Sequence, residues 1–115
     1  MKSAVDPVFE FKFGDAVARG CIVRDGFLIV AGSTTLKEGS ALRKRDRDER
    51  DRLLRIGILV EHSNPDLYVF SRDHTCTSAS QAAGIVKDGN ASGPQLWLDP
   101  LTSLTLREHL QVAAQ

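Results

Sequence analysis

The sequence lacks the features that mark several large classes of protein. It has no apolar run that approaches the length of a membrane span, and its N-terminus lacks the apolar core of a signal peptide. Its two cysteines, Cys21 and Cys76, lie outside any Cys-x-x-Cys spacing, which favours reduced, buried thiols over a disulfide framework. Fifteen basic residues balance fifteen acidic ones, so no overall field attracts nucleic acid or an anionic membrane. We therefore expect a cytoplasmic protein with no membrane partner, whose electrostatic contacts come from a local patch.

The sequence also lacks a recognisable catalytic or metal-binding set. Asp73, His74 and Cys76 suggest a thiol-imidazole dyad or a pair of metal ligands. Zinc needs about four ligands in paired spacings, and only two more histidines and one more cysteine remain to complete such a set. We favour Cys76 as an ordinary core residue. The sequence therefore predicts no enzyme, no metal site and no cofactor.

The length and the residue patterns predict one small α+β domain over residues 1–115. Three apolar segments, residues 8–13, 16–23 and 27–31, read as strands, and the Asp25-Gly26 pair between the last two is typical of a hairpin turn. We expect a small antiparallel sheet, made of this N-terminal meander plus one or two later strands, with about three short helices packed on it. The later elements that we predict are strands at 58–60 and 67–70, a helix ending at Gly57, a helix at 79–87 and a terminal helix that begins after Thr105.

Two capping boxes locate two of these helices. In the first, the Ser78 hydroxyl can accept from the backbone of Gln81 while the Gln81 side chain returns to Ser78, and Thr105 and Glu108 form the second. The small residues of the 79–87 helix allow a strand to approach it closely.

A charged run at residues 43–55 has two interpretations. It carries seven basic side chains against four acidic ones, so it could contact phosphates. The interleaved acids instead favour a solvated helix face held by local ion pairs. The preceding part of this polar region, around residues 35–48, is expected to be flexible.

The loop at residues 89–93 also has two interpretations. Small residues expose backbone N–H groups, and Asn90 and Ser92 add side-chain donors, so the loop could hold an anion or a base edge. The alternative is a structural turn that directs Trp97 into the core, because the loop follows a helix and carries no lysine-serine phosphate motif.

Three blocks of the sequence resemble a known family. They are A-R-G-C-I-V-R-D-G-F-L-I-V-A-G-S at residues 18–33, R-L-L-R-I-G-I-L at residues 52–59, and the helix, glycine loop and tryptophan at residues 77–97. The chain resembles a bacterial and archaeal family of domains of unknown function, number four-three-five-seven, which is similar to the RAMA domain of restriction enzymes and adenine methylases. Two positions depart from the family pattern: Asp88 stands at a usual glycine, with Gly89 one step late, and Ser92 stands at a usual asparagine. The residues that match the helix, loop and tryptophan are Ser78, Ser80, Ala82, Ala83, Ala91, Gly93 and Trp97.

The resemblance implies a non-catalytic module, because relatives are often fused to GIY-YIG nucleases or lie beside restriction-modification genes. We therefore predict a nucleic-acid-binding or accessory module of a restriction-modification or nuclease-related system, which could sense modified DNA. The alternative is a protein-interaction module that docks on a nuclease, a methylase or its own copy through the small-residue face of the 79–87 helix. The residues assigned to DNA contact are Arg43, Lys44, Arg45, Arg47, Lys87, Asn90, Ser92 and Gly93, and those assigned a structural role are Ser78, Ala82, Ala83, Gly89 and Trp97.

Overall fold

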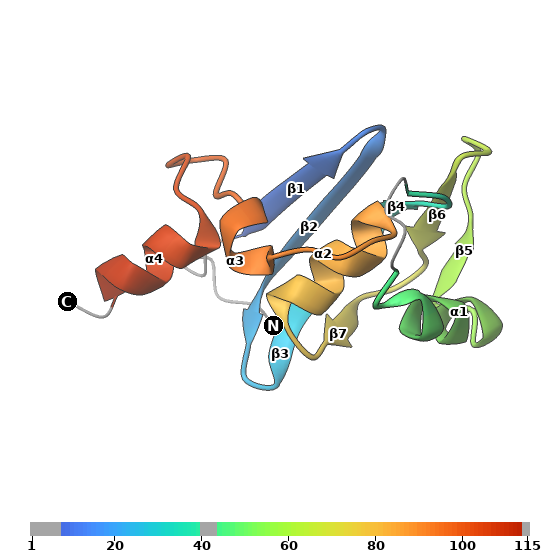
Figure 1. The fold of residues 1–115 in the computed structure, drawn as a ribbon, viewed down its shortest axis with the longest axis horizontal. Coiled ribbons are helices and arrows are strands. Elements are labelled where there is room, and N and C mark those ends of the chain that lie inside the picture. The colour runs from blue at the N-terminus through green and yellow to red at the C-terminus, as the bar shows by residue number, and fades with distance from the viewer. Residues whose placement is uncertain (1–7, 40–43, 114–115) are drawn as a thin grey trace.

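A computed structural model describes residues 8–39 and 44–113 (Figure 1). Arg43, one of the residues predicted to contact DNA, and part of the segment expected to be flexible lie outside the described residues. The described chain contains strands in two antiparallel sheets and four helices, which confirms the predicted α+β class.

The first sheet, sheet A, confirms the N-terminal meander. Its strands are β1 (Phe9–Phe13), β2 (Ala16–Val23), β3 (Gly26–Ile29) and β7 (His74–Cys76), in the order β1-β2-β3-β7, with antiparallel neighbours. Val23 pairs with Gly26, so the turn consists of Arg24 and Asp25 and the glycine belongs to the strand. A Cβ atom at Gly26 would lie 2.0 Å from the carbonyl oxygen of Cys76, so the glycine permits the close approach of β7.

The second sheet, sheet B, contains the two later strands that the sequence predicts and one that it does not. Its order is β4-β6-β5, from β4 (Thr34–Leu36), β6 (Leu67–Phe70) and β5 (Leu59–Glu61). We predicted no strand at β4 or at β7. The Thr34 hydroxyl accepts from the Val17 N–H at 2.8 Å and donates to the Val17 carbonyl at 3.2 Å, so a side chain joins β4 to sheet A.

The predicted end of one helix and the predicted start of another are formed by the expected chemistry. Helix α1 (Arg47–Arg55) stops before Gly57, whose φ is 79°. The Ile58 N–H donates to the Leu53 carbonyl at 3.0 Å and the Gly57 N–H donates to the Leu54 carbonyl at 3.3 Å, as in a Schellman motif. Helix α4 (Leu106–Ala113) begins with the reciprocal capping box of Thr105 and Glu108.

The capping box of α2 (Ala79–Lys87) differs from the prediction in one bond. The Ser78 hydroxyl accepts from the Gln81 N–H at 3.0 Å, as expected, but the Gln81 side chain accepts from Thr77 at 2.9 Å and not from Ser78. The backbone of Ser78 is extended, and the N–H group within reach of the Gln81 side chain is that of Thr77 and not that of Ser78. The N-terminus of α2 is therefore capped twice.

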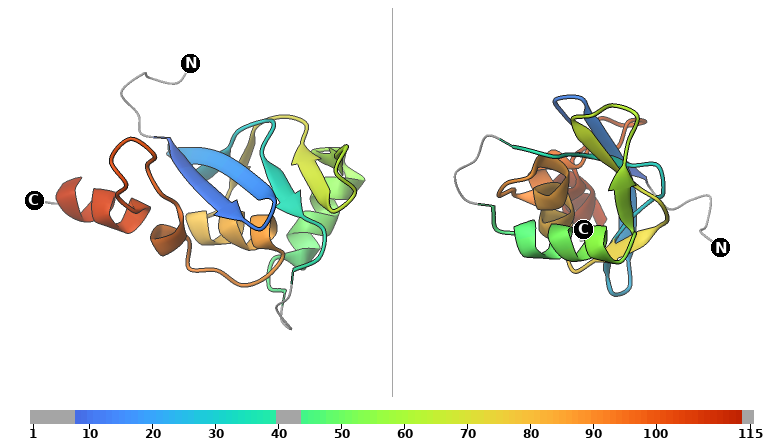
Figure 2. Two further views of the ribbon diagram at one scale, coloured as in Figure 1. Left: turned by 90° about the horizontal axis from the view of Figure 1, so that it is seen from above. Right: turned by 90° about the vertical axis from the view of Figure 1, so that its right-hand side faces the viewer.

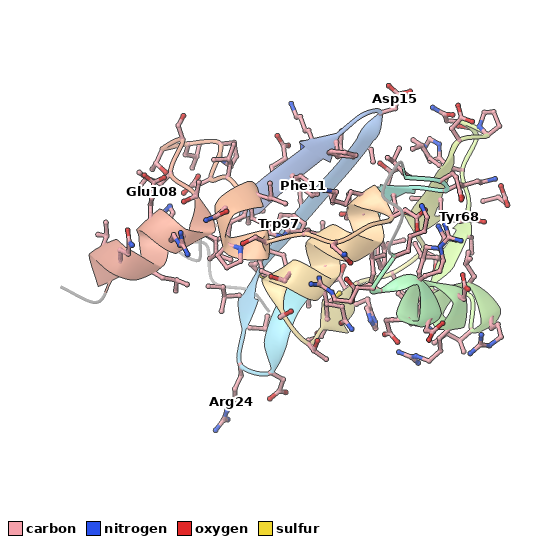
Figure 3. The ribbon with its side chains drawn as sticks, in the orientation of Figure 1. Phe11, Asp15, Arg24, Tyr68, Trp97 and Glu108 are labelled. Atoms are coloured by element: carbon pink, nitrogen blue, oxygen red, sulfur yellow. The ribbon has the colours of Figure 1, made fainter. Side chains whose placement is uncertain are left out.

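Helix α2 and Trp97 form the centre of the core. The helix lies across one face of sheet A (Figures 1 and 2), with Ala82, Ala83 and Gly84 buried. Trp97, which follows the short helix α3 (Gly93–Leu96), is 0% exposed, and its ring centroid lies 4.6 Å from that of Phe27. It also faces Phe11, as Figure 3 shows. The loop after α2 thus directs the tryptophan inward, as its structural interpretation predicts.

Candidate nucleic-acid interface

The segment that leads into α1 contacts the loop that follows α2. The backbone N–H of Arg45 donates to the side-chain oxygen of Asn90 at 3.1 Å, and the Arg45 guanidinium donates to the Ser80 carbonyl at 3.1 Å. Two candidate site residues that lie far apart in the sequence are therefore neighbours. The basic segment and the glycine loop share one part of the surface.

Three polar side chains at this contact face solvent. The Arg45 side chain is 48% exposed, and Asn90 and Ser92 are exposed. Because the oxygen of Asn90 accepts from Arg45, its amide NH₂ group points its donors elsewhere. Arg45 also donates to Asp46 through Nε and Nη2, so its Nη1 is the nitrogen with no acceptor among the described residues. These groups are hydrogen-bond donors, which suit an acceptor-rich ligand.

Gly93 and Lys87, two further residues predicted to contact DNA, make contacts within the protein. Gly93 is buried, its N–H donates to the Ser80 hydroxyl at 2.9 Å, and a Cβ atom there would lie 2.2 Å from the Ala79 carbonyl carbon. Gly93 therefore permits the packing of α3 on α2. The Lys87 ammonium lies 5.0 Å from the centre of the Phe13 ring, in a cation–π contact.

The remaining described basic candidates surround Asp88. Lys44 Nζ donates to the Asp88 carboxylate at 2.9 Å, Arg47 Nε donates to it at 2.8 Å, and a second Arg47 nitrogen binds its other oxygen. Arg50 Nη1 lies 3.4 Å from the same carboxylate, and the Gly39 N–H donates to it at 2.8 Å. We define these five residues as the Asp88 cluster.

The backbone conformation and the ionisation state of Asp88 suit it to the centre of this cluster of cations. Asp88 caps the C-terminus of α2 in the left-handed conformation, with φ of 54°, which aspartate adopts more readily than most residues. Burial by itself would raise the pKa of Asp88, but hydrogen bonds from Arg47, Gly39 and Lys44 hold that pKa well below its ordinary value. The carboxylate is therefore ionised and joins α2 to α1.

Ion pairs also lie along α1 and the residues that lead into it. Arg52 pairs with Glu49 at 2.7 Å, Arg45 pairs with Asp46 at 3.0 Å, and Arg47 reaches Glu38 at 3.2 Å. The Arg52 and Arg45 pairs agree with the interpretation of this run as a solvated helix face held by local ion pairs. Arg47 and the buried Arg50 instead contact the distant Asp88, so that interpretation holds only in part. It does not exclude phosphate contact, because Arg45 and Arg52 remain about half exposed.

The residues of the discounted dyad do not form an exposed cleft. Cys76 is 1% exposed, and burial raises the pKa of its thiol to about 12, so the thiolate is scarce at neutral pH. Asp73 accepts from the Ala31 N–H at 2.8 Å, and His74 lies 3.7 Å from Glu49. Within residues 8–39 and 44–113 no group of three metal-ligating side chains gathers.

Sequence reasoning missed the roles of Asp88 and Arg50. Asp88 was noted only as a departure from the family pattern, and Arg50 was counted with the solvated charges although it is 6% exposed. The available signal was an aspartate in place of glycine directly after a helix, where a left-handed residue is common.

Comparisons with known proteins identify the family. Residues 9–108 match the family described as Domain of unknown function (DUF4357). Searches of curated proteins and of solved structures returned no match. None of the described helices combines the length and the apolar character that a membrane crossing requires.

Proposed function

We propose that this chain, which belongs to the DUF4357 family, is a non-catalytic module that binds nucleic acid at the contact between Arg45 and the 89–93 loop. The observation that carries the proposal is the hydrogen bond from the Arg45 N–H to Asn90. It places a half-exposed guanidinium beside two exposed polar side chains of the loop. A cytoplasmic place beside a restriction-modification or nuclease system belongs to the same proposal.

The chemistry of the exposed groups supports a phosphate ligand. The Arg45 guanidinium and the Asn90 amide NH₂ can only donate hydrogen bonds, and the Ser92 hydroxyl can also donate. Phosphate oxygens only accept, and contacts to them account for much of the affinity of proteins for DNA. Such contacts do not read sequence, so any discrimination of modified DNA would have to come from base-edge contacts of Asn90 or Ser92.

Salt-titrated binding to plain and methylated duplex DNA tests the proposal. We expect binding at low salt that weakens as salt rises, and we expect Arg45→Ala to lower the slope of log K against log salt by roughly 0.9. Asn90→Ala should weaken binding with a smaller change in slope. The matched control is Arg24→Ala, which removes an exposed arginine at the tip of the β2–β3 hairpin (Figure 3).

Two results would contradict the proposal. One is the absence of binding at low salt, and the other is an equal effect of Arg45→Ala and Arg24→Ala. The second result would indicate a nonspecific response to net charge.

A protein-interaction module is the second candidate. The small-residue face of α2, which motivated it, is buried within the chain, so docking would have to use another surface. The observation that favours it is the exposure of Leu101 (93%), Leu110 (50%) and Val112 (63%) in the C-terminal part. Native mass spectrometry separates the two candidates: a dimer that Leu110→Ser disrupts, together with no DNA affinity, would favour interaction.

A further inference from the structure

We infer that Asp88 is an internal counter-ion that withholds Lys44 and Arg47 from phosphate and so sets the strength of the proposed nucleic-acid contact. The inference rests on the proposed function for the identity of the ligand. The withholding itself depends only on the contacts of the Asp88 cluster, so it can be tested with a simple anion.

The donors of Lys44 are fully occupied inside the protein. Its ammonium donates to the Gly39 carbonyl at 2.7 Å, to the Asp88 carboxylate at 2.9 Å and to the Asp88 carbonyl at 3.3 Å. An ammonium group has three N–H donors, and these three acceptors take all of them. A phosphate could bind Lys44 only by displacing one of these bonds.

Arg47 is also engaged. Its Nε and Nη2 grip the two oxygens of the Asp88 carboxylate, in the bidentate geometry that makes arginine–carboxylate pairs strong. Nη2 also donates to both oxygens of Glu38 at 3.2 Å. The Nε–Nη2 edge of the guanidinium, which could hold a phosphate in the same bidentate manner, is therefore occupied by Asp88, and Nη1 is the one nitrogen of Arg47 with no acceptor among the described residues.

The burial of the cluster shows which groups could be released. The Asp88 side chain is 1% exposed, whereas those of Lys44 and Arg47 are 20% and 29% exposed. Both cations therefore lie nearer to solvent than the carboxylate that neutralises them. The Arg50 side chain is 7% exposed and donates to the Lys37 carbonyl at 2.6 Å, so it stays inside in either case.

The matched pair Asp88→Asn and Asp48→Asn tests the inference. Asparagine tolerates the left-handed backbone at position 88, and Asp48 is an exposed acid in the first turn of α1, so both changes remove one negative charge nearby. We expect Asp88→Asn to steepen the salt dependence of DNA binding by roughly 0.9 for each released cation. Each such contact multiplies the affinity lost over a fourfold rise in salt by about 3.5. Asp48→Asn should leave the slope unchanged, and an equal slope in the two variants would overturn the inference.

A second set of variants keeps the test valid if Asp88→Asn does not fold. In the native background, Lys44→Ala and Arg47→Ala should leave the salt slope unchanged, because neither side chain contacts phosphate, whereas Arg45→Ala should reduce it. Equal reductions by all three substitutions would overturn the inference. Circular dichroism confirms that each variant is folded before its slope is compared.

A sulfate titration separates failure of this inference from failure of the proposed function. Sulfate stabilises most folded proteins and can also meet the exposed donors at Arg45, so sodium sulfate should raise both melting temperatures above those in sodium chloride of equal ionic strength. The rise should be larger for Asp88→Asn than for the native chain, because Lys44 and Arg47 then also bind the anion. The same response in both proteins would overturn the inference even if DNA binds. An absence of DNA binding by the native chain would overturn only the proposed function.

Discussion

Substitution of Gly93 by alanine should strongly destabilise the protein, because the position has no space for a methyl group. The added Cβ would lie 2.2 Å from the Ala79 carbonyl carbon, 2.4 Å from its oxygen and 2.4 Å from the Ser80 nitrogen. These are backbone atoms of the first turn of α2, so they cannot rotate away as a side chain would. Forcing an extra carbon into a packed site costs roughly 1–3 kcal/mol, and we expect the upper end of that range.

Two hydrogen bonds at the same place add to the cost. The Gly93 N–H donates to the Ser80 hydroxyl at 2.9 Å, and the Trp97 indole N–H donates to the Ala79 carbonyl at 3.0 Å. A shift of α3 that relieves the clash would lengthen both, at about 1 kcal/mol each. The total loss of unfolding free energy is therefore near the upper end of about 3–5 kcal/mol, a large part of the 5–15 kcal/mol that is typical of a domain.

Urea denaturation followed by fluorescence and circular dichroism measures this loss. Trp97 is the single tryptophan, and it lies beside the substitution, so its emission reports directly on the packing that we expect to fail. Ser92→Ala is the control, because Ser92 is exposed and its side chain makes no capping bond, and its effect should stay within about 0.5 kcal/mol. A loss below about 1 kcal/mol for Gly93→Ala would refute the reasoning from close packing.

Two further predictions concern ionisable groups in the core. The Cys76 thiol should resist a disulfide reagent at pH 8 in the native protein and react in urea, since burial raises its pKa to about 12; fast native reaction of a Cys21→Ser variant would contradict this. Burial lowers the pKa of His74, although Glu49 opposes the shift, so the neutral ring is favoured in the folded state. Stability should therefore fall as pH drops below about 6.5, the pKa of unfolded histidine, and His74→Gln should reduce the difference in melting temperature between pH 7.5 and pH 5.5.

Local signals were enough to locate the elements that are stabilised locally. The apolar run at residues 16–23 predicted β2 at its observed bounds, and the capping box at Ser78 with the small residues after it did the same for α2. Gly57 marked the end of α1 because a left-handed residue is needed there. In each case the chemistry that forms the element lies within a few residues of it.

The elements that we missed depend on distant contacts. β4 and β7 have three residues each, and neither contains an apolar run like that at residues 58–60, which predicted the equally short β5. The close approach of the Cys76 carbonyl to Gly26 places β7, and the hydrogen bonds between Thr34 and Val17 place β4. Neither contact leaves a pattern in the sequence.

The candidate site was also predictable only in part. The residue types of the charged run and the loop were visible, but the contact between Arg45 and Asn90 spans more than forty residues and depends on the whole fold. The attraction of three cations to Asp88 could not be read from a count of charges, because the count does not say which acid is buried. Net local charge therefore overstated the number of cations available to a ligand.

The order of the strands has a consequence for synthesis of the protein. All of sheet B lies between β3 and β7 in the chain, although β3 and β7 are neighbours in sheet A. During translation, at roughly 5–20 residues per second, the edge of β3 stays unpaired for several seconds until Cys76 has been made. An unpaired edge is a template for other chains, so the nascent protein is most open to misassembly in that interval. The close fit of β7 against Gly26 ends this exposure and closes sheet A around the segment that forms sheet B.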